Sequence, residues 1–217
     1  MKIKRRLTKL HGVETKMESK KIEYLLTNIP IISTMVDETH LRVILPQLGK
    51  AMAIPGDIVE LGCNVGTTSI FIQAFLEGRK PFNVYDSFEG FPDKLPVDEG
   101  EEYHFTFEKG GCATTADIFK SIFEDLNIPL PEIHQGWFKD AEYPEKIAFA
   151  FFDSDFYSSI LDSWEKVYPR LSPGAVVCIH DYGWGVLPGC KAACDEFLKD
   201  KPEKIDAVNF IGILVKK

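Results

Sequence analysis

The stretch at residues 57–69, which reads DIVELGCNVGTTS, constrains the fold more than any other part of the chain. It predicts a short buried strand that ends in an acidic residue and a glycine turn and then runs into a helix. A parallel α/β sheet binds its ligand at the carboxyl ends of its strands, and glycine lets the backbone approach that ligand closely. The sequence therefore places a ligand site at this turn.

The spacing of the glycines indicates which ligand the turn binds. Dinucleotide enzymes use G-x-G-x-x-G, with the pyrophosphate on the helix N-terminus. Gly62 and Gly66 are separated here by three other residues, so the middle glycine is missing. Glu60 also faces the predicted site, and a carboxylate suits an ammonium or sulfonium group better than a phosphate. The pattern favours S-adenosylmethionine over NAD.

Size and composition favour a single globular domain without a membrane span. The chain has 217 residues, of which 45% are hydrophobic, and its longest apolar run, residues 147–152, has six. A bilayer span needs about 18 or more. The first ten residues also lack the apolar segment of a secretory signal. The five cysteines are an odd number, so reduced thiols in a cytoplasmic protein are expected.

Charge is unevenly distributed along the chain. Residues 1–21 carry a net charge of +6, and the remainder carries −14. An acidic body repels phosphate, so we expect no nucleic acid partner. We predict a basic N-terminal tail or helix over residues 1–33 and one domain over residues 34–217.

Alternating strand and helix patterns predict a parallel sheet with helices on both faces. The last residues are too few for a helical crossover and favour a closing antiparallel hairpin, with Asn209 in its turn. We predict helices at 38–52, 67–77, 114–127, 156–171 and 189–199, strands at 57–61, 81–85, 131–135, 147–153 and 175–180, and the hairpin within 204–217. The residues Ser172-Pro173-Gly174 are expected to end the predicted helix at 156–171.

The second strand ends at Asp86, which lies 20 residues beyond Gly66. An acid at this place can accept both hydroxyls of an adenosine ribose; the alternative is an ordinary surface turn. The long polar stretch 87–111 follows, and we interpret it as a lid over the site. Trp137, after the third strand, could cover an adenine ring or belong to the core.

Two acidic clusters follow buried strands and predict a metal site. Asp153 and Asp155 come after one strand, and His180 and Asp181 come after the next. Both clusters should meet at the carboxyl edge of the sheet, where packed carboxylates repel each other unless a cation neutralises them. Oxygen ligands suit Mg²⁺ or Mn²⁺, and an imidazole moves the preference toward Mn²⁺. The alternative is that Asp155 caps the following helix and His180 packs in the core.

Five motifs occur in order between about residue 34 and residue 197: IPGDIVELG at 54–62, DSFEGFP at 86–92, FDSDFY at 152–157, YPRLSPG at 168–174 and HDYG at 180–183. Together they resemble the macrocin O-methyltransferase family, a class I S-adenosylmethionine-dependent group that acts on sugar hydroxyls of natural products. The resemblance implies a Rossmann-like class I methyltransferase fold with a seven-stranded, mostly parallel sheet. It also implies a divalent metal, usually Mg²⁺.

Residue by residue, the turn at 60–66 matches the methionine-binding motif of the family, and Asp86 with Ser87 matches its ribose-binding edge. Asp153 matches an acid that serves as metal ligand and base, and Asp181 matches a further metal ligand. His180 is a departure, because the family commonly reads Asp-Asp-Tyr at 180–182. One ligand is thus changed from oxygen to nitrogen, or lost.

We therefore expect an O-methyltransferase acting on a small sugar-containing or polyhydroxylated acceptor, with Asp153 and His180 as catalytic residues. Asp153, Asp181 and His180 are expected to hold the metal. The alternatives are a metal-independent methyltransferase in which His180 is the base, and a non-catalytic adenosyl-binding module. Small methyltransferases of this type often pair, so a homodimer is one arrangement to expect. The residues expected to bind the donor are Glu60, Gly62, Asn64, Gly66, Thr67, Asp86, Ser87, Trp137 and Asp153.

Overall fold

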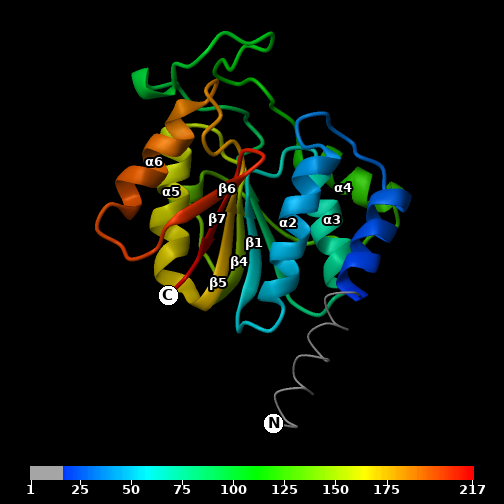
Figure 1. Ribbon diagram of the computed structural model, residues 1–217. Helices are drawn as coiled ribbons and strands as arrows, with labels where there is room; N and C mark the ends of the chain where they lie inside the picture. The colour runs from blue at the N-terminus through cyan, green and yellow to red at the C-terminus, as the bar shows by residue number, and fades with distance from the viewer. Residues whose placement is uncertain (1–16) are drawn as a thin grey trace, which may run out of the picture.

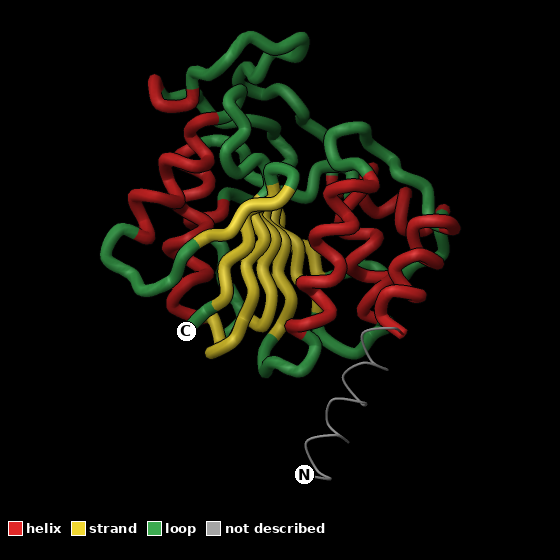
Figure 2. Tube along the Cα trace, viewed as in Figure 1, coloured by secondary structure: helices red, strands yellow, loops and turns green. Residues whose placement is uncertain are grey.

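The computed structural model describes residues 17–217 and contains a seven-stranded sheet between two layers of helices (Figures 1 and 2). The strand order is β3-β2-β1-β4-β5-β7-β6. The first five strands run parallel, and β7 pairs antiparallel with both β5 and β6. The expected Rossmann-like sheet with a C-terminal antiparallel hairpin is confirmed.

Most elements lie within two residues of their predicted ranges. The strands are β1 (Asp57–Leu61), β2 (Phe82–Asp86), β3 (Glu132–Gln135), β4 (Ile147–Phe152), β5 (Leu171–Ile179), β6 (Ile205–Val208) and β7 (Ile211–Val215). The helices are α2 (Glu38–Ala51), α3 (Thr67–Leu76), α4 (Ala116–Asp125), α5 (Tyr157–Val167) and α6 (Pro188–Leu198), with short 3₁₀ turns η1 (Pro96–Asp98), η2 (Phe138–Asp140) and η3 (Tyr168–Arg170). Throughout residues 17–217, no helix combines the length and apolar character that crossing a membrane requires.

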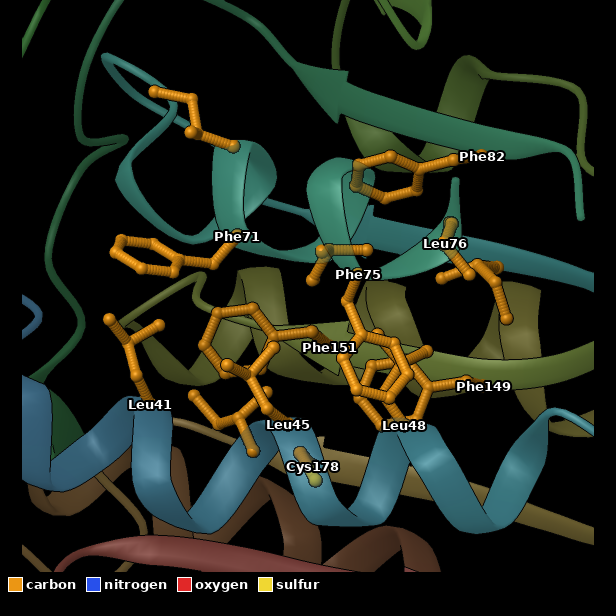
Figure 3. Packing of buried hydrophobic residues seen from close by; sticks show 14 of the residues in the cluster. Leu41, Leu45, Leu48, Phe71, Phe75, Leu76, Phe82, Phe149, Phe151 and Cys178 are labelled. Carbon is orange, nitrogen blue, oxygen red and sulfur yellow. The ribbon is translucent and has the colours of Figure 1, made fainter. Parts of the chain in front are cut away.

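Each face of the sheet has its own hydrophobic core. On one face, apolar side chains of α2 and α3 interlock with Phe149 and Phe151 of β4 (Figure 3). On the other, α5 and α6 pack against Phe152 of β4 and Ile179 of β5. Burying each such side chain contributes about 1.5–3 kcal/mol. Strand β4 is buried on both faces, as its continuous apolar run predicts.

The carboxyl ends of β1 and β4 lie at the point where the strand order of the sheet reverses. The strand order reverses between these neighbours, since β1 leads on to β2 and β4 leads on to β5. In open α/β sheets, ligands bind at such a switch point. The loops after both strands therefore meet at one place.

The connection between α5 and β5 differs from the prediction. Pro169 removes a backbone donor, so α5 ends at Val167 and continues only as the 3₁₀ turn η3. Strand β5 then begins at Leu171, which pairs with Ile147, rather than at residue 175. Pro173, which is expected from the sequence to separate the helix from the strand, lies within β5 where the pairing register with β4 shifts. Such an irregularity in the pairing tolerates proline.

The predicted C-terminal hairpin has a two-residue turn. Asn209 and Phe210 have φ of 50° and 61°, which both lie in the left-handed region. Two consecutive positive φ values are typical of the type I′ turn that joins antiparallel strands most tightly. The prediction of Asn209 in the turn is confirmed.

Residues 87–111 form a long loop over the carboxyl edge of the sheet, with η1 as its one regular turn (Figure 2). The buried carboxylate of Asp98 fixes this loop. Its Oδ1 accepts the backbone N–H of Tyr157 at 2.7 Å, and its Oδ2 accepts that of Leu95 at 2.9 Å. Asp98 therefore caps the first turn of α5, whose own N-cap residue, Phe156, supplies no side-chain bond.

The N-terminal segment packs on the domain where the structure describes it. Residues 17–28 are helical, and Ile22 and Leu25 lie in the same core as α2 and α3. The Lys21 ammonium donates to the Phe75 carbonyl at 2.7 Å. The basic residues before position 17 lie outside the described residues, so the division at residue 33 stays a prediction.

Gly62 offers a test of how tightly the two central strands are joined. A Cβ on Gly62 would lie 1.9 Å from the Asp153 carbonyl oxygen, and φ there is +86°. We predict that Gly62→Ala lowers the free energy of unfolding by more than about 3 kcal/mol, because backbone strain and a backbone clash add. Gly78→Ala is the matched control, since φ is +71° but nothing lies within 4 Å. Urea unfolding should show a loss of only about 1 kcal/mol for the control; equal losses would contradict the close approach.

Candidate active site

The turn after β1 has the backbone geometry that its glycines predict. Gly62 and Gly66 have φ of +86° and +87°, and Asn64 between them has φ of 45°. Gly66 is the N-cap of α3 and supplies no side-chain bond to it. The N–H groups of the first turn of α3 are thus free of a side-chain cap, as anion-binding helix N-termini require.

Asp86 holds this turn from the end of β2. Its Oδ2 accepts the backbone N–H groups of Cys63 and Asn64, both at 2.8 Å. Its Oδ1 accepts the N–H of Phe88 at 2.8 Å. A carboxylate has about four acceptor positions, so capacity for a further donor remains.

A cavity of about 480 Å³ opens at the carboxyl ends of β1 and β4. Among the predicted residues, Gly66 is the exception because it does not line the cavity. The lack of a side chain at Gly66 makes room for the Phe119 ring, since a Cβ on Gly66 would lie 2.8 Å from Phe119 Cε2. Trp137 is 37% exposed at the cavity wall, so it does not belong to the core. The predicted residues that do line the cavity are Glu60, Gly62, Asn64, Thr67, Asp86, Ser87, Trp137, Asp153, His180 and Asp181.

Glu60 is the most buried acid in this wall, with 1% of its surface exposed. The Ser69 hydroxyl donates to its Oε2 at 2.5 Å. Burial raises the pKa of Glu60 well above its usual value, and the charges of Asp153 and Asp86 raise it further against the lowering effect of Ser69. A cation in the cavity would favour the charged form of Glu60.

Asp153, His180 and Asp181 converge as predicted. His180 Nδ1 lies 3.0 Å from Asp153 Oδ1 and 3.0 Å from Asp181 Oδ2. The candidate ligand atoms of the three residues all lie within 4.8 Å of one another. Although both oxygens are near, His180 Nδ1 makes no well-aligned hydrogen bond. Two carboxylates and a buried imidazole nitrogen together form a set of ligand atoms that fits a divalent cation.

The two carboxylates also control the charge of His180, which is 6% exposed. Burial lowers the pKa of its imidazole, but the neighbouring Asp153 and Asp181 outweigh that effect and raise the pKa well above 6.5. A protonated His180 would place its positive charge between the two carboxylates. Losing the Nδ1 proton frees that atom as a ligand.

Asp155 belongs to the cavity rather than to the helix that follows it. It lines the wall with φ of 58°, and the N-cap of α5 is Phe156. The alternative of a helix-capping Asp155 is therefore wrong. Burial raises the pKa of Asp155 well above its usual value, with further contributions from Asp153 and Asp181.

His40 is a neighbour of the site that no sequence pattern identifies. It is the third residue of α2, and its Nδ1 accepts the Asp37 N–H at 3.3 Å while Asp37 Oδ1 accepts the His40 N–H at 3.1 Å. That capping box marks only a helix start. Yet the same Nδ1 lies 3.5 Å from His180 Nε2, a contact between residues 140 positions apart. Burial lowers the pKa of His40, and a charge on His180 lowers it further.

Comparison with known proteins places this architecture in context. Residues 9–217 match the family described as Macrocin-O-methyltransferase (TylF). An 8-demethyl-8-(2,3-dimethoxy-alpha-L-rhamnosyl)-tetracenomycin-C 4'-O-methyltransferase of Streptomyces olivaceus is 32% identical in an alignment that covers 68% of this chain and 59% of the relative. A Mycinamicin III 3''-O-methyltransferase of Micromonospora griseorubida is 31% identical over 66% of this chain and 61% of its own. This chain thus spans about three fifths of the length of these curated relatives.

The solved structure of the O-methyltransferase NovP has a similar fold. Its TM-score is 0.69 at 22% identity, with 83% of this chain and 82% of that chain covered. At that identity the likeness concerns the fold alone. It agrees with the sheet and helix layers described above.

The pKa of His180 leads to a test of the cation site. We predict that Mn²⁺ binds more weakly as the pH falls below the raised pKa of His180, by up to about tenfold per pH unit, because Nδ1 must release its proton. Calorimetry in buffers of different ionisation enthalpy should show about one proton released per Mn²⁺ bound.

His180→Asn is the matched control for this test, because its amide oxygen can still act as a ligand but does not titrate near neutral pH. The control should release fewer protons, and its Mn²⁺ affinity should vary less with pH. The same pH dependence in both proteins would mean that His180 is not a ligand.

Proposed function

Because this chain belongs to the macrocin O-methyltransferase family, we propose that it transfers a methyl group from S-adenosylmethionine to a hydroxyl of a small sugar-containing or polyhydroxylated acceptor. One observation carries the proposal. A single cavity is lined both by the glycine turn with Asp86 and by the Asp153–His180–Asp181 group. Methyl transfer requires donor and acceptor side by side, and binding of both in one cavity would meet that requirement.

The donor half of the cavity suits an adenosyl sulfonium compound. Glu60 faces the cavity with a raised pKa, so a positively charged ligand would be stabilised there as the carboxyl ionises. The remaining acceptor position of Asp86 suits a ribose hydroxyl. The first turn of α3 would take the methionine carboxylate, and Trp137 would cover the adenine ring.

The acceptor class is inferred from the relatives. Their names describe methylation of a rhamnosyl-tetracenomycin at its 4' oxygen and of mycinamicin III at its 3'' oxygen. By analogy, the acceptor of this chain would offer a sugar hydroxyl to Asp153 and its neighbours. The loop 87–111 would close over it and exclude water.

Asp153, Asp181 and Nδ1 of His180 would hold a divalent cation, with Mg²⁺ expected from the oxygen ligands and Mn²⁺ favoured by the nitrogen. When bound, such a cation supplies Lewis-acid polarisation that lowers the pKa of an acceptor hydroxyl. The chain itself must orient that hydroxyl and accept its proton. The oxygen then takes the methyl group from sulfur in an in-line displacement, which releases S-adenosylhomocysteine.

Three residues are candidates for the proton acceptor. The sequence indicates Asp153 or His180, and both also contribute ligand atoms to the cation group. An atom that ligates a cation is a weaker base. Asp155 lines the same cavity outside that group, and burial together with Asp153 and Asp181 raises its pKa, which makes it a stronger base than an ordinary carboxylate. We therefore add Asp155 to Asp153 and His180 as a candidate for the general base.

A transfer assay with labelled S-adenosylmethionine, glycosylated acceptors and Mg²⁺ or Mn²⁺ tests the proposal. We predict that Asp153→Asn and Asp181→Asn each lower kcat at least about 100-fold, because both remove a ligand from the cation group. Calorimetry should show that Asp181→Asn still binds S-adenosylhomocysteine. Asp86→Asn should instead weaken that binding about tenfold or more, because it removes a charged acceptor.

Asp155→Asn distinguishes base from ligand. We expect it to lower kcat strongly while leaving Mn²⁺ affinity within about threefold of wild type, because a base outside the ligand group can be lost without loss of the cation. Turnover that resists chelators would instead support a metal-independent enzyme with His180 as base. Donor binding without transfer to any acceptor would support an adenosyl-binding module and contradict the proposal.

A further inference from the structure

We propose that His40 positions His180: its Nδ1 accepts the Nε2–H of His180, so that the imidazole presents Nδ1 to Asp153 and Asp181. This inference rests on the cation site of the proposed function. It adds a residue from a distant part of the chain, at the start of α2, to that site. His40 acts through His180 and is therefore a positioning residue.

The two nitrogens of His180 face different partners. Nδ1 lies 3.0 Å from each of the Asp153 and Asp181 carboxylates. Nε2 lies 3.5 Å from His40 Nδ1, with the two rings nearly perpendicular at 87° and their centroids 4.8 Å apart. An edge-to-face arrangement directs the edge of one ring at its neighbour. His180 is thus held between carboxylates on one side and an imidazole on the other.

The surroundings of His40 identify its Nδ1 as an acceptor. The backbone N–H of Asp37 points at this atom from 3.3 Å, and a backbone amide can only donate. The nearby Asp37 Oδ1 is already occupied, because it accepts from the Thr39 N–H at 2.8 Å, the Thr39 hydroxyl at 2.6 Å and the His40 N–H at 3.1 Å. His40 Nδ1 is therefore an acceptor, and it shares its one lone pair between the Asp37 N–H and Nε2 of His180 at 3.5 Å.

A lone pair on His40 selects one form of His180. A histidine that ligates through Nδ1 carries its remaining ring proton on Nε2, and here that N–H meets an acceptor. Partners of this kind fix the tautomer and the ring orientation, and their loss typically weakens metal binding by about 10–100-fold. The burial of His180 limits replacement of the acceptor by bulk water.

The same atom of His40 also caps α2, so a test must separate the two roles. Glutamine is a common third residue of a capping box. Its acceptor oxygen extends farther from Cα than Nδ1 of histidine does, so His40→Gln should keep the helix start but lose the contact with His180. The amide oxygen of asparagine lies close to the place of Nδ1, so His40→Asn should keep the acceptor. His40→Ala removes both functions.

The experiment measures Mn²⁺ affinity by electron paramagnetic resonance and the thermal unfolding midpoint of each full-length variant. We expect His40→Gln and His40→Ala to bind Mn²⁺ about tenfold or more weakly, and His40→Asn to bind within about threefold of wild type. His40→Gln should unfold at the wild-type temperature. Long-range ¹H–¹⁵N correlation spectra of the Mg²⁺-saturated protein should show the His180 ring proton on Nε2 in wild type and in His40→Asn.

Wild-type Mn²⁺ affinity in His40→Gln and His40→Ala would overturn the inference. Equal losses in all three variants, together with lower unfolding midpoints, would also overturn it, because they would indicate a purely structural role. Asp153→Asn separates this failure from that of the site itself. If Asp153→Asn binds Mn²⁺ as wild type does, the proposed cation site is refuted, and the proposed role of His40 is refuted with it.

Discussion

The close approach of the β1 and β4 ends at Gly62 is the contact on which the site depends. With no side chain at Gly62, the Asp153 carbonyl oxygen occupies the place that a Cβ would need. This contact brings the glycine turn, which suits the methyl donor, next to Asp153 of the Asp153–His180–Asp181 group. Asp86 then fixes the turn through two backbone N–H groups. Backbone packing thus brings the glycine turn and the Asp153–His180–Asp181 group into one crevice.

Acidic side chains dominate the electrostatics of this crevice. Glu60, Asp86, Asp153, Asp155 and Asp181 all line one cavity, and burial with mutual repulsion raises the pKa of Glu60 and Asp155. Packed acids of this kind are stabilised by positive charge. A sulfonium donor and a divalent cation would provide it at the two halves of the cavity. The same two carboxylates, Asp153 and Asp181, raise the pKa of His180 despite its burial.

Local patterns in the sequence predict most of the fold. Apolar runs and glycine turns place β1, α3, β4 and the C-terminal hairpin, and they bring the Asp153–His180–Asp181 group together. Errors arise where one residue overrides a periodic pattern. Pro169 ends α5 earlier than its apolar spacing indicates, and the register shift lets β5 include Pro173.

Contacts between distant segments are what the sequence does not reveal. His40 reaches His180 across 140 positions, and Asp98 caps α5 across 59. Each has an ordinary local role as well, in a capping box or a 3₁₀ turn, so no spacing distinguishes it. Asp155 was ambiguous for the same reason, since an acid before a helix usually caps it. Its positive φ turns it toward the cavity instead.

Anomalous diffraction from crystals grown with S-adenosylhomocysteine and Mn²⁺ would locate the proposed cation relative to the bound product. We expect one strong manganese peak between the carboxylates of Asp153 and Asp181, beside the sulfur of the product. Product in the cavity with no manganese between these two residues would contradict that expectation.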